Sequence, residues 1–306
     1  MSTCSIFHKI KLTTDVVVYQ GSFLRQDIVV GFEDEAENII QYLNEESKEL
    51  DVISIVGMSS LGKTTLARKI LRDPRIEYEF PTRLWVYVSQ VYRVKDIFLS
   101  ILRDLSWITE DMYDKTKREI AQTLRVRLEK EKFLIVLDDM WTTRAWDDLR
   151  DAFPMTNKMS KILITSRMIN VAYHTNHRRQ PHQLRFLRDE ESWELLQLSI
   201  FGKLNNCLKD LEFPGKVIAD MCDGLPLVIM LVGGVLAKTT SAREMKVIKS
   251  SWMKTKESMR RTLHMDRERR FEEIVMLSYN SLPSKLKPCF LYLEIFQKTL
   301  KSQLRD

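Results

Sequence analysis

The residues best suited to chemistry lie at positions 57–65, which read Gly-Met-Ser-Ser-Leu-Gly-Lys-Thr-Thr. Two glycines separated by four residues and followed by Lys63 and Thr64 form the phosphate-loop pattern. The glycines allow a tight turn close to a phosphate, and Lys63 carries a point charge for the β and γ phosphates. The Thr64 hydroxyl suits Mg²⁺, which prefers oxygen ligands. The residues predicted to bind a nucleoside di- or triphosphate here are Gly57, Met58, Ser59, Ser60, Leu61, Gly62, Lys63, Thr64 and Thr65.

The segments on either side of this loop support the prediction. Residues 51–56 form a short apolar run rich in β-branched residues, which is typical of a buried parallel strand. Residues 66–71 are good helix formers. A strand that leads through a loop into a helix directs backbone N–H groups and the positive end of the helix toward an anion. The alternative is a chance Gly-Lys-Thr in a surface loop, and the agreement of strand, loop and helix argues against it.

A second apolar run, at 132–139, ends in the acids Asp138 and Asp139. The carboxyl ends of parallel strands are where open α/β sheets bind ligands. We therefore expect Asp138 to hold Mg²⁺, directly or through water, and Asp139 to orient or deprotonate an attacking water. The predicted catalytic residues are Asp139 and Lys63. The alternative is a strand that ends in two solvated acids.

Two further segments carry candidate site residues. The strand-like run 162–167 ends in Arg167, a cation that could contact a γ-phosphate and report its presence; the alternative is an ordinary surface arginine. In the segment 222–227, Gly224 permits an unusual turn and Pro226 fits the first turn of a helix. A structural role and a contact to adenine or ribose both remain open for this segment. The six tryptophans, Trp141 among them, are interpreted as packing residues.

The composition is that of a globular protein, because 44% of the 306 residues are hydrophobic and 29% are charged. The net charge of +6 comes from residues 238–270, where eleven Lys and Arg face four Asp and Glu. This stretch is interpreted as solvated helix and loop surface, with no specific nucleic-acid partner, since no aromatic interleaving supports base stacking. The alternative is a patch that binds nucleic acid or an anionic membrane. The longest apolar run, at 225–237, is too short to span a bilayer and predicts a buried helix. Four scattered cysteines and the lack of an evident signal peptide indicate a cytoplasmic protein with reduced thiols.

Along the chain, predicted strands at 52–56, 84–89, 133–137, 161–165 and 183–187 alternate with predicted helices. The helices are expected at 35–50, 64–71, 94–105, 116–130, 145–152 and 169–173, then at 190–201, 213–222, 225–237, 271–280 and 288–296. The alternation predicts an α/β fold with a parallel sheet covered by helices on both faces. The expected organisation is a poorly ordered lead at 1–28, a nucleotide-binding domain at 29–181, a helical domain at 182–262 and a partial third module at 263–306.

Taken in order, these segments resemble the NB-ARC domain of plant intracellular immune receptors, the nucleotide-binding leucine-rich-repeat class. The resemblance covers residues 29–296 and comes nearest to the coiled-coil-type, late-blight-resistance-like receptors. Besides the phosphate loop, it rests on Val-Val-Gly-Phe-Glu at 29–33, Arg-Leu-Trp-Val-Tyr-Val-Ser-Gln at 83–90, Phe-Leu-Ile-Val-Leu-Asp-Asp-Met-Trp at 133–141, Ser-Lys-Ile-Leu-Ile-Thr-Ser-Arg at 160–167, Glu-Ser-Trp-Glu-Leu-Leu at 191–196, Gly-Leu-Pro-Leu at 224–227, Ser-Tyr-Asn-Ser-Leu-Pro at 278–283 and Leu-Lys-Pro-Cys-Phe-Leu at 286–291.

The resemblance implies a P-loop NTPase of the STAND class that acts as an ATP/ADP switch in plant defence. Such domains hold ADP at rest, open and oligomerise with ATP, and return to rest by slow hydrolysis. Carried over to this chain, Val29 and Val30 offer backbone groups to adenine, Pro226 packs near the base, and Arg167 senses the γ-phosphate. A three-layer P-loop sheet is expected, followed by an ARC1-like helical domain and a partial winged-helix, ARC2-like domain. The implied partners are adenine nucleotide, Mg²⁺ and related receptors or a second copy, with no transmembrane segment.

The chain departs from the family pattern in three ways. Ser59 and Ser60 stand where the family usually has glycines, and a positive φ at Ser60 would cost roughly 1–2 kcal/mol. If that cost arises on binding, nucleotide affinity falls about tenfold. The third module is cut short before its Met-His-Asp motif, and the coiled coil and leucine-rich repeats are absent. We expect a truncated receptor, with an interaction module that pairs with full-length receptors as the alternative function. A dedicated phosphotransferase or motor ATPase would need an acceptor site, for which the sequence has no signature.

Overall fold

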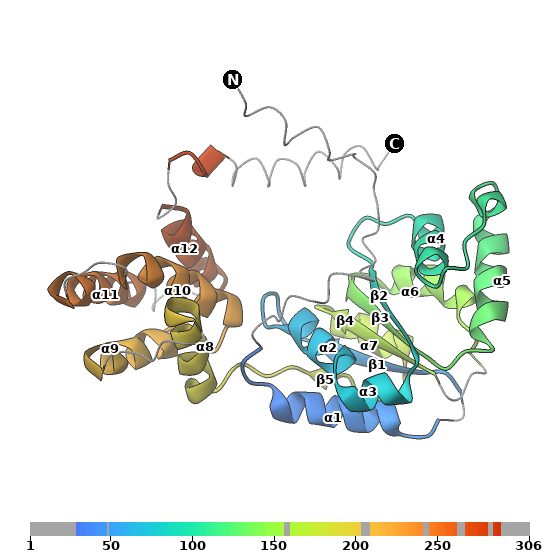
Figure 1. Ribbon diagram of the computed structural model, residues 1–306, viewed down its shortest axis with the longest axis horizontal. Coiled ribbons are helices and arrows are strands. Elements are labelled where there is room, and N and C mark those ends of the chain that lie inside the picture. Colours follow the sequence, from blue (N-terminus) through green and yellow to red (C-terminus); the bar gives the residue numbers. More distant parts are fainter. Residues whose placement is uncertain are drawn as a thin grey trace. The chain divides into compact units, whose positions relative to one another are not determined.

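The structure is a computed structural model that describes residues 29–47, 49–155, 160–202, 209–240, 245–261, 267–280 and 284–288 (Figure 1). The predicted lead at 1–28 lies outside the described residues. So do most of the predicted third module at 263–306 and, apart from residue 288, the helix expected at 288–296.

The chain forms two compact units. Within the described residues, the first unit comprises 39–56 and 70–182, and the second comprises 29–38, 57–69 and 183 onward. Helices α1 (Glu33–Asn44) and α2 (Lys63–Leu71) each begin in the second unit and end in the first. The phosphate loop therefore belongs to the second unit and the strand that precedes it belongs to the first. The domain boundaries expected from the sequence stay a prediction.

A five-stranded sheet with the order β2-β3-β4-β1-β5 forms the centre of the first unit (Figure 1). Its strands are β1 (Asp51–Val56), β2 (Thr82–Tyr87), β3 (Phe133–Met140), β4 (Lys161–Ser166) and β5 (His182–Gln183). The pairs β1–β4, β3–β4 and β2–β3 are parallel, which confirms the expected parallel sheet. The strand predicted at 183–187 is only two residues long.

The strands form because both faces of the sheet are covered. Every residue of β1 and β4 is buried, which explains their nearly continuous apolar runs. Side chains alternate between the faces: Val52 and Ile162 join a core cluster on one face, while the neighbouring Ile53 and Leu163 are also at most 1% exposed.

Helices and short 3₁₀ turns supply the rest of the first unit. They are α3 (Pro74–Glu79), α4 (Val94–Asp104), η2 (Glu110–Tyr113), α5 (Lys117–Leu128), α6 (Thr143–Leu149), η3 (Arg150–Ala152) and α7 (Ile169–Thr175). Side chains such as Ile97 of α4, Leu124 of α5 and Trp146 of α6 join the core cluster on the sheet. The sequence reading missed α3, although Asp73 caps it and Pro74 begins it, which is a common start signal.

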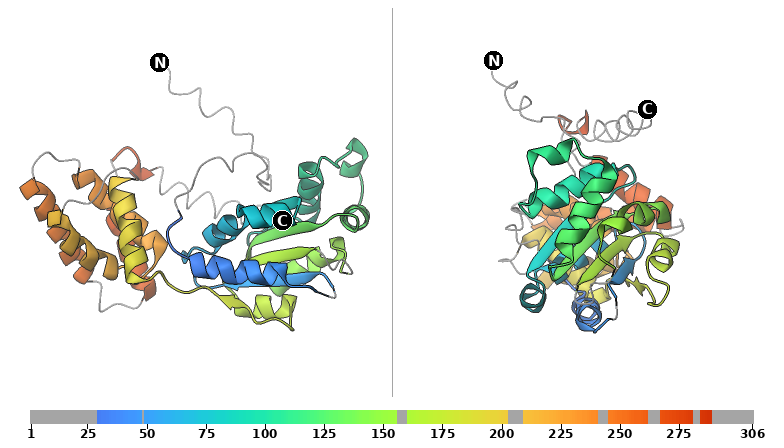
Figure 2. Two further views of the ribbon diagram at one scale, coloured as in Figure 1. Left: turned by 60° about the horizontal axis from the view of Figure 1, so that its bottom comes forward. Right: turned by 90° about the vertical axis from the view of Figure 1, so that its right-hand side faces the viewer.

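Helices make up most of the described part of the second unit (Figure 2). They are α8 (Asp189–Phe201), α9 (Lys209–Asp220), α10 (Pro226–Thr240), α11 (Met245–Arg260) and α12 (Arg267–Asn280). Helix α10 packs against α8, α11 and α12, and its residues Val228, Ile229 and Leu236 are at most 2% exposed. The helix predicted at 225–237 is therefore present, but only one of its faces is buried, because Leu227 is 38% and Met230 is 55% exposed. None of the helices in the described part of the chain has the length and apolar character needed to cross a membrane.

Candidate nucleotide-binding site

The phosphate loop follows β1 and ends where α2 begins, at Lys63. Ser60 has φ +65° and Gly62 has φ +102°, so the loop turns through two left-handed positions. Lys63 is 7% exposed, and its Nζ donates to the carbonyl oxygens of Gly57 and Met58 at 2.8 Å each. Two loop carbonyls therefore hold the ammonium group over the loop, where a phosphate-binding cation is required.

Ser60 carries the backbone strain expected from the sequence. A non-glycine residue at this φ costs roughly 1–2 kcal/mol, so we expect Ser60→Gly to raise the free energy of unfolding by about 1 kcal/mol. Denaturant titration of the purified chain measures the change. Ser59→Gly is the matched control, because Ser59 is not among the residues with positive φ, and it is expected to give no stabilisation. Equal effects of the two substitutions would contradict the strain assignment.

Two other segments of the second unit lie against the loop. A Cβ added to Gly62 would lie 3.1 Å from the Phe32 ring and 3.8 Å from Pro226 Cγ. A Cβ on Gly57 would lie 2.8 Å from Leu61. The structure therefore brings together the segment 29–32, the phosphate loop and the first residue of α10. These are the three parts that the sequence assigns to base and phosphate binding.

Arg185 contacts Phe32 and Asp34, which follow Val29 and Val30 in the chain. It donates two hydrogen bonds to the Glu191 carboxylate at 2.7 and 2.8 Å and one to Asp34 at 2.8 Å, and its guanidinium lies 5.5 Å from the centre of the Phe32 ring. The hydrogen bond from Arg185 lowers the pKa of Asp34 to about 2. Sequence reasoning missed this residue because it placed Arg185 in a strand at 183–187.

The first unit holds the two acids at the end of β3. The β3–β4 register shifts there: Leu137 pairs with Ile164 and Met140 pairs with Ser166, so β3 has one extra residue, and Asp139 has φ +58°. The hydroxyl of Thr165, the β4 residue between those two, donates to Asp138 Oδ1 at 2.5 Å and accepts from the Asp139 backbone N–H at 2.9 Å. Asp138 is 3% exposed and Thr165 is 1% exposed.

The Asp139 carboxylate has three cationic or hydrogen-bonding neighbours among the described residues. Trp141 Nε1 donates to its Oδ2 at 2.9 Å, Tyr87 donates to the same oxygen at 3.3 Å, and Arg167 Nε lies 3.7 Å from Oδ1. Burial and the nearby Asp139 charge raise the pKa of Tyr87, so the phenol stays protonated at neutral pH. The structure thus brings Asp139 and Arg167 together.

Sequence reasoning missed Thr165, Tyr87 and the second role of Trp141. The interpretation of Trp141 as a packing residue is incomplete, because its indole N–H hydrogen-bonds to Asp139. A signal was available: Tyr87 and Thr165 stand at or next to the last positions of β2 and β4, and the carboxyl ends of parallel strands meet at one sheet edge.

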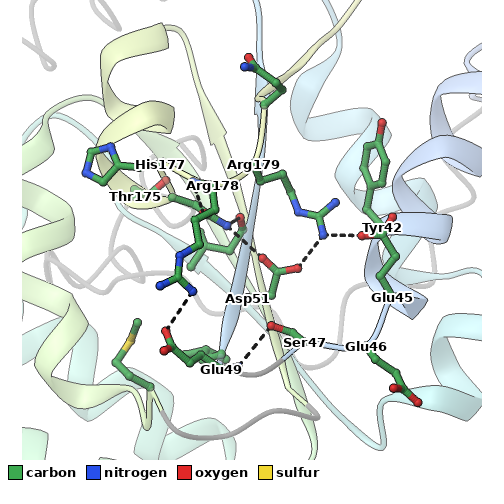
Figure 3. Close-up of a pocket in the computed structure, with 15 residues that line it drawn as sticks. Tyr42, Glu45, Glu46, Ser47, Glu49, Asp51, Thr175, His177, Arg178 and Arg179 are labelled. Atoms are coloured by element: carbon green, nitrogen blue, oxygen red, sulfur yellow. Dashed lines mark hydrogen bonds and ion pairs between the residues drawn. The ribbon is translucent and has the colours of Figure 1, made fainter.

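A separate pocket of about 630 Å³ lies at the amino end of β1 (Figure 3). Several of its charged groups form ion pairs: Arg179 contacts Glu45 at 2.6 Å and Asp51 at 3.0 Å. Buried Lys161, which does not line the pocket, lies 3.4 Å from Asp51. Burial lowers the pKa of Lys161. Because Asp51 of β1 pairs with both Arg179 and Lys161, we interpret these ion pairs as a structural cluster that fixes the start of β1.

A parallel α/β sheet whose strand β1 leads into this glycine-bounded loop, with a buried lysine at the start of the next helix, defines a P-loop nucleotide-binding protein. The sequence comparison then gives the family: residues 32–205, more than half of the chain, match the model of the NB-ARC domain. The chain belongs to the NB-ARC domain family, as the sequence predicted.

The chain is similar to plant disease-resistance proteins along most of its length. It is 36% identical over 286 residues to the disease resistance protein RPP13 of Arabidopsis thaliana. This alignment covers 92% of this chain and 33% of that protein. It is 40% identical over 268 residues to a putative late blight resistance protein homolog of Solanum demissum, covering 88% of this chain and 20% of that protein. The chain thus spans a third or less of the length of these relatives.

Solved structures share the fold. The Aeropyrum pernix ORC2 protein, solved as ADPNP–ADP complexes, has a TM-score of 0.53 at 13% identity, covering 92% of this chain and 91% of that chain. The Drosophila ORC, solved bound to DNA, has a TM-score of 0.52 at 11% identity, and the match covers 89% of this chain and 80% of that chain. At these identities the likeness shows the fold alone, and it confirms the predicted P-loop α/β class. The roles of the individual site residues stay predictions.

Proposed function

We propose that this chain is the adenine-nucleotide switch of a plant disease-resistance protein, acting in the cytoplasm and upstream of the hypersensitive response. It holds ADP at rest, exchanges it for ATP on activation and returns to rest by slow hydrolysis. The observation that supports this best is the position of Lys63, buried at the start of α2 and held by two loop carbonyls. Membership of the NB-ARC family supports the same conclusion.

The types of residue present suit the nucleotide and its metal. In this proposal the backbone of residues 57–65 and the Lys63 ammonium hold the phosphates. The Thr64 hydroxyl and the Asp138 carboxylate supply the hard oxygen ligands that Mg²⁺ prefers. The hydrogen bond from Thr165 orients Asp138. When bound, Mg²⁺ neutralises phosphate charge.

The base would lie near the segment that contains Val29 and Val30 and near Pro226. Two observations support this proposal: Arg185 contacts Asp34, which lies just after the two valines, and Pro226 lies at the first position of α10. Asp139 would orient or deprotonate water, and Arg167 would contact the γ-phosphate. Asp139 is suited to the first role because it is 20% exposed while Asp138 is buried.

We expect Asp139→Ala to retain ATP binding and to lower the rate of hydrolysis by roughly 10²–10⁴-fold, the usual contribution of a positioned general base. Phosphate release under single-turnover conditions measures the rate, and calorimetry measures the affinity. Asp151→Ala serves as the control, because Asp151 is an exposed acid in η3, and we expect it to leave both quantities unchanged. Unchanged phosphate release from Asp139→Ala would remove this residue from the mechanism.

Nucleotide released from freshly purified protein gives a direct test of the switch. Abundant ADP supports it. Protein that carries no nucleotide and binds none on titration would favour the second candidate, an interaction module that pairs with related receptors. Turnover well above about 1 s⁻¹ would instead indicate a dedicated enzyme.

A further inference from the structure

Trp141 contacts both Asp139, which the proposed mechanism assigns to the attacking water, and Arg167, which it assigns to the γ-phosphate. Its indole N–H donates to Asp139 at 2.9 Å, and the Arg167 guanidinium carbon lies 4.4 Å from the centre of its ring system. Arg167 Nε also lies 3.7 Å from the Asp139 carboxylate. The three side chains therefore form a closed triangle of one hydrogen bond, one ion pair and one cation–π contact.

The triangle begins at the register shift of β3. The extra residue gives Asp139 its positive φ, and Trp141 is the first residue after β3 ends at Met140. From β2, Tyr87 adds a second donor to the same Asp139 oxygen at 3.3 Å. Two side-chain donors therefore hold the Oδ2 atom of Asp139. Arg167 is more easily moved, because its side chain is 38% exposed while it contacts the carboxylate and the indole face.

A guanidinium that lies over tryptophan is attracted to the ring, and tryptophan is the strongest aromatic partner for a cation. To contact Arg167, the γ-phosphate of a nucleoside triphosphate must compete with this attraction and with the negative charge of Asp139. A nucleoside diphosphate has no γ-phosphate, so its binding does not have to break these contacts. The contacts of Arg167 therefore favour the diphosphate state over the triphosphate state.

We propose that Trp141 is a positioning residue that holds Arg167 beside Asp139 and thereby sets the preference of the site for ADP over ATP. This inference rests on the proposed switch and on the γ-phosphate role of Arg167. It assigns to Trp141 a task that packing alone does not require. The indole N–H holds Asp139 by a hydrogen bond. The ring face holds Arg167 away from the γ-phosphate by the cation–π contact.

The test is the ratio of affinities for ADP and a non-hydrolysable ATP analogue, measured by calorimetry with Mg²⁺ on the whole chain. Trp141→Leu removes the ring face and the N–H, and we expect the ratio to shift about two- to fivefold toward ATP, the size of one cation–π contact. Trp141→Phe retains a weaker face and is expected to shift the ratio in the same direction by about twofold. If Trp141→Leu does not fold, the affinity ratio of Trp141→Phe tests the proposal in its place.

Two comparisons separate this role from a structural one. In the Arg167→Ala background, Trp141→Leu should no longer change the ratio, because the group it restrains is absent. Trp107→Leu is the matched control: the Arg127 guanidinium lies 5.7 Å from the Trp107 ring, so this variant removes a similar pair elsewhere in the same unit. We expect it to leave the ratio unchanged.

The outcomes distinguish the two proposals. A wild-type chain that binds neither nucleotide overturns the proposed function. A wild-type chain that binds both, with a ratio that the Trp141 variants do not change, overturns the role of Trp141 alone. A shift that persists in the Arg167→Ala background also overturns it, because the effect would then not act through the arginine.

Discussion

Lys63→Ala is expected to lower the affinity for both ADP and ATP by at least about 100-fold. Charge-assisted hydrogen bonds to phosphate contribute roughly 1.5–3 kcal/mol each, and 2.7 kcal/mol corresponds to a factor of 100. The lysine is well placed for this effect because it is 7% exposed and hydrogen-bonded to two carbonyls of its own loop. No other side chain at positions 57–65 carries a positive charge. Calorimetric titration with each nucleotide measures the loss.

The controls for Lys63→Ala must distinguish the loss of the charge at the phosphate loop from two other effects, the change in net charge and a loss of folding. Lys216→Ala removes one positive charge from α9, where Lys216 is 55% exposed and pairs with Glu212 one turn away. It is expected to bind both nucleotides as the wild type does. A thermal unfolding curve shows whether Lys63→Ala is folded, since the change also leaves two loop carbonyls without this donor. Wild-type affinity in folded Lys63→Ala would reject the phosphate-loop assignment.

The parts of the site that could be predicted are those determined by local sequence. β1 begins one residue before its predicted start, and α2 begins one residue before its predicted start at Thr64. An apolar run followed by glycine, lysine and threonine leaves few local alternatives. The acids at 138 and 139 were placed at a strand end for the same reason. The prediction of the class of protein therefore depends mainly on these local signals.

The arrangement around Asp139 depends on contacts between distant segments, so the sequence could not predict it. Thr165 lies 26 residues from Asp139 and Tyr87 lies 52 residues from it. Only the register of three adjacent strands brings them together. The extra residue in β3 has no local marker, because an aspartate at positive φ is compatible with many turns.

The errors in the predicted helices have two different origins, one local and one tertiary. Helix α1 ends at Asn44, six residues before its predicted end. The acids at 45 and 46 are unfavourable beside the negative end of a helix dipole. Helix α11 lies within the basic stretch at 238–270, which the sequence indicates only as a solvated surface, without helix bounds. It is stabilised by tertiary contacts, among them Trp252, which is fully buried and donates to Thr240 at 3.2 Å.

The second large effect is expected at Gly224, where backbone geometry alone determines the residue. Gly224 has φ +66°, and its carbonyl accepts a hydrogen bond from the Leu187 N–H at 3.0 Å. A Cβ at this position would lie 2.4 Å from the Leu187 carbonyl oxygen. Gly224→Ala combines a left-handed backbone penalty with a clash against main chain that cannot rotate away. We expect the free energy of unfolding to fall by about 3 kcal/mol, which lowers the melting temperature by about 6–12 °C.

Gly234→Ala is the matched comparison, because it makes the same chemical change ten residues further along the same segment. Gly234 lies in α10 and is exposed, and among the described residues no atom lies within 4 Å of the added Cβ. Alanine is the better helix former by roughly 0.5–1 kcal/mol, so this variant should melt slightly higher than the wild type. Opposite signs for the two substitutions would show that the turn before Pro226 requires glycine. Stability losses of similar size at both positions would mean that Gly224 is not constrained by its contact with Leu187, and the fixed position of Pro226 beside the phosphate loop would then need another cause.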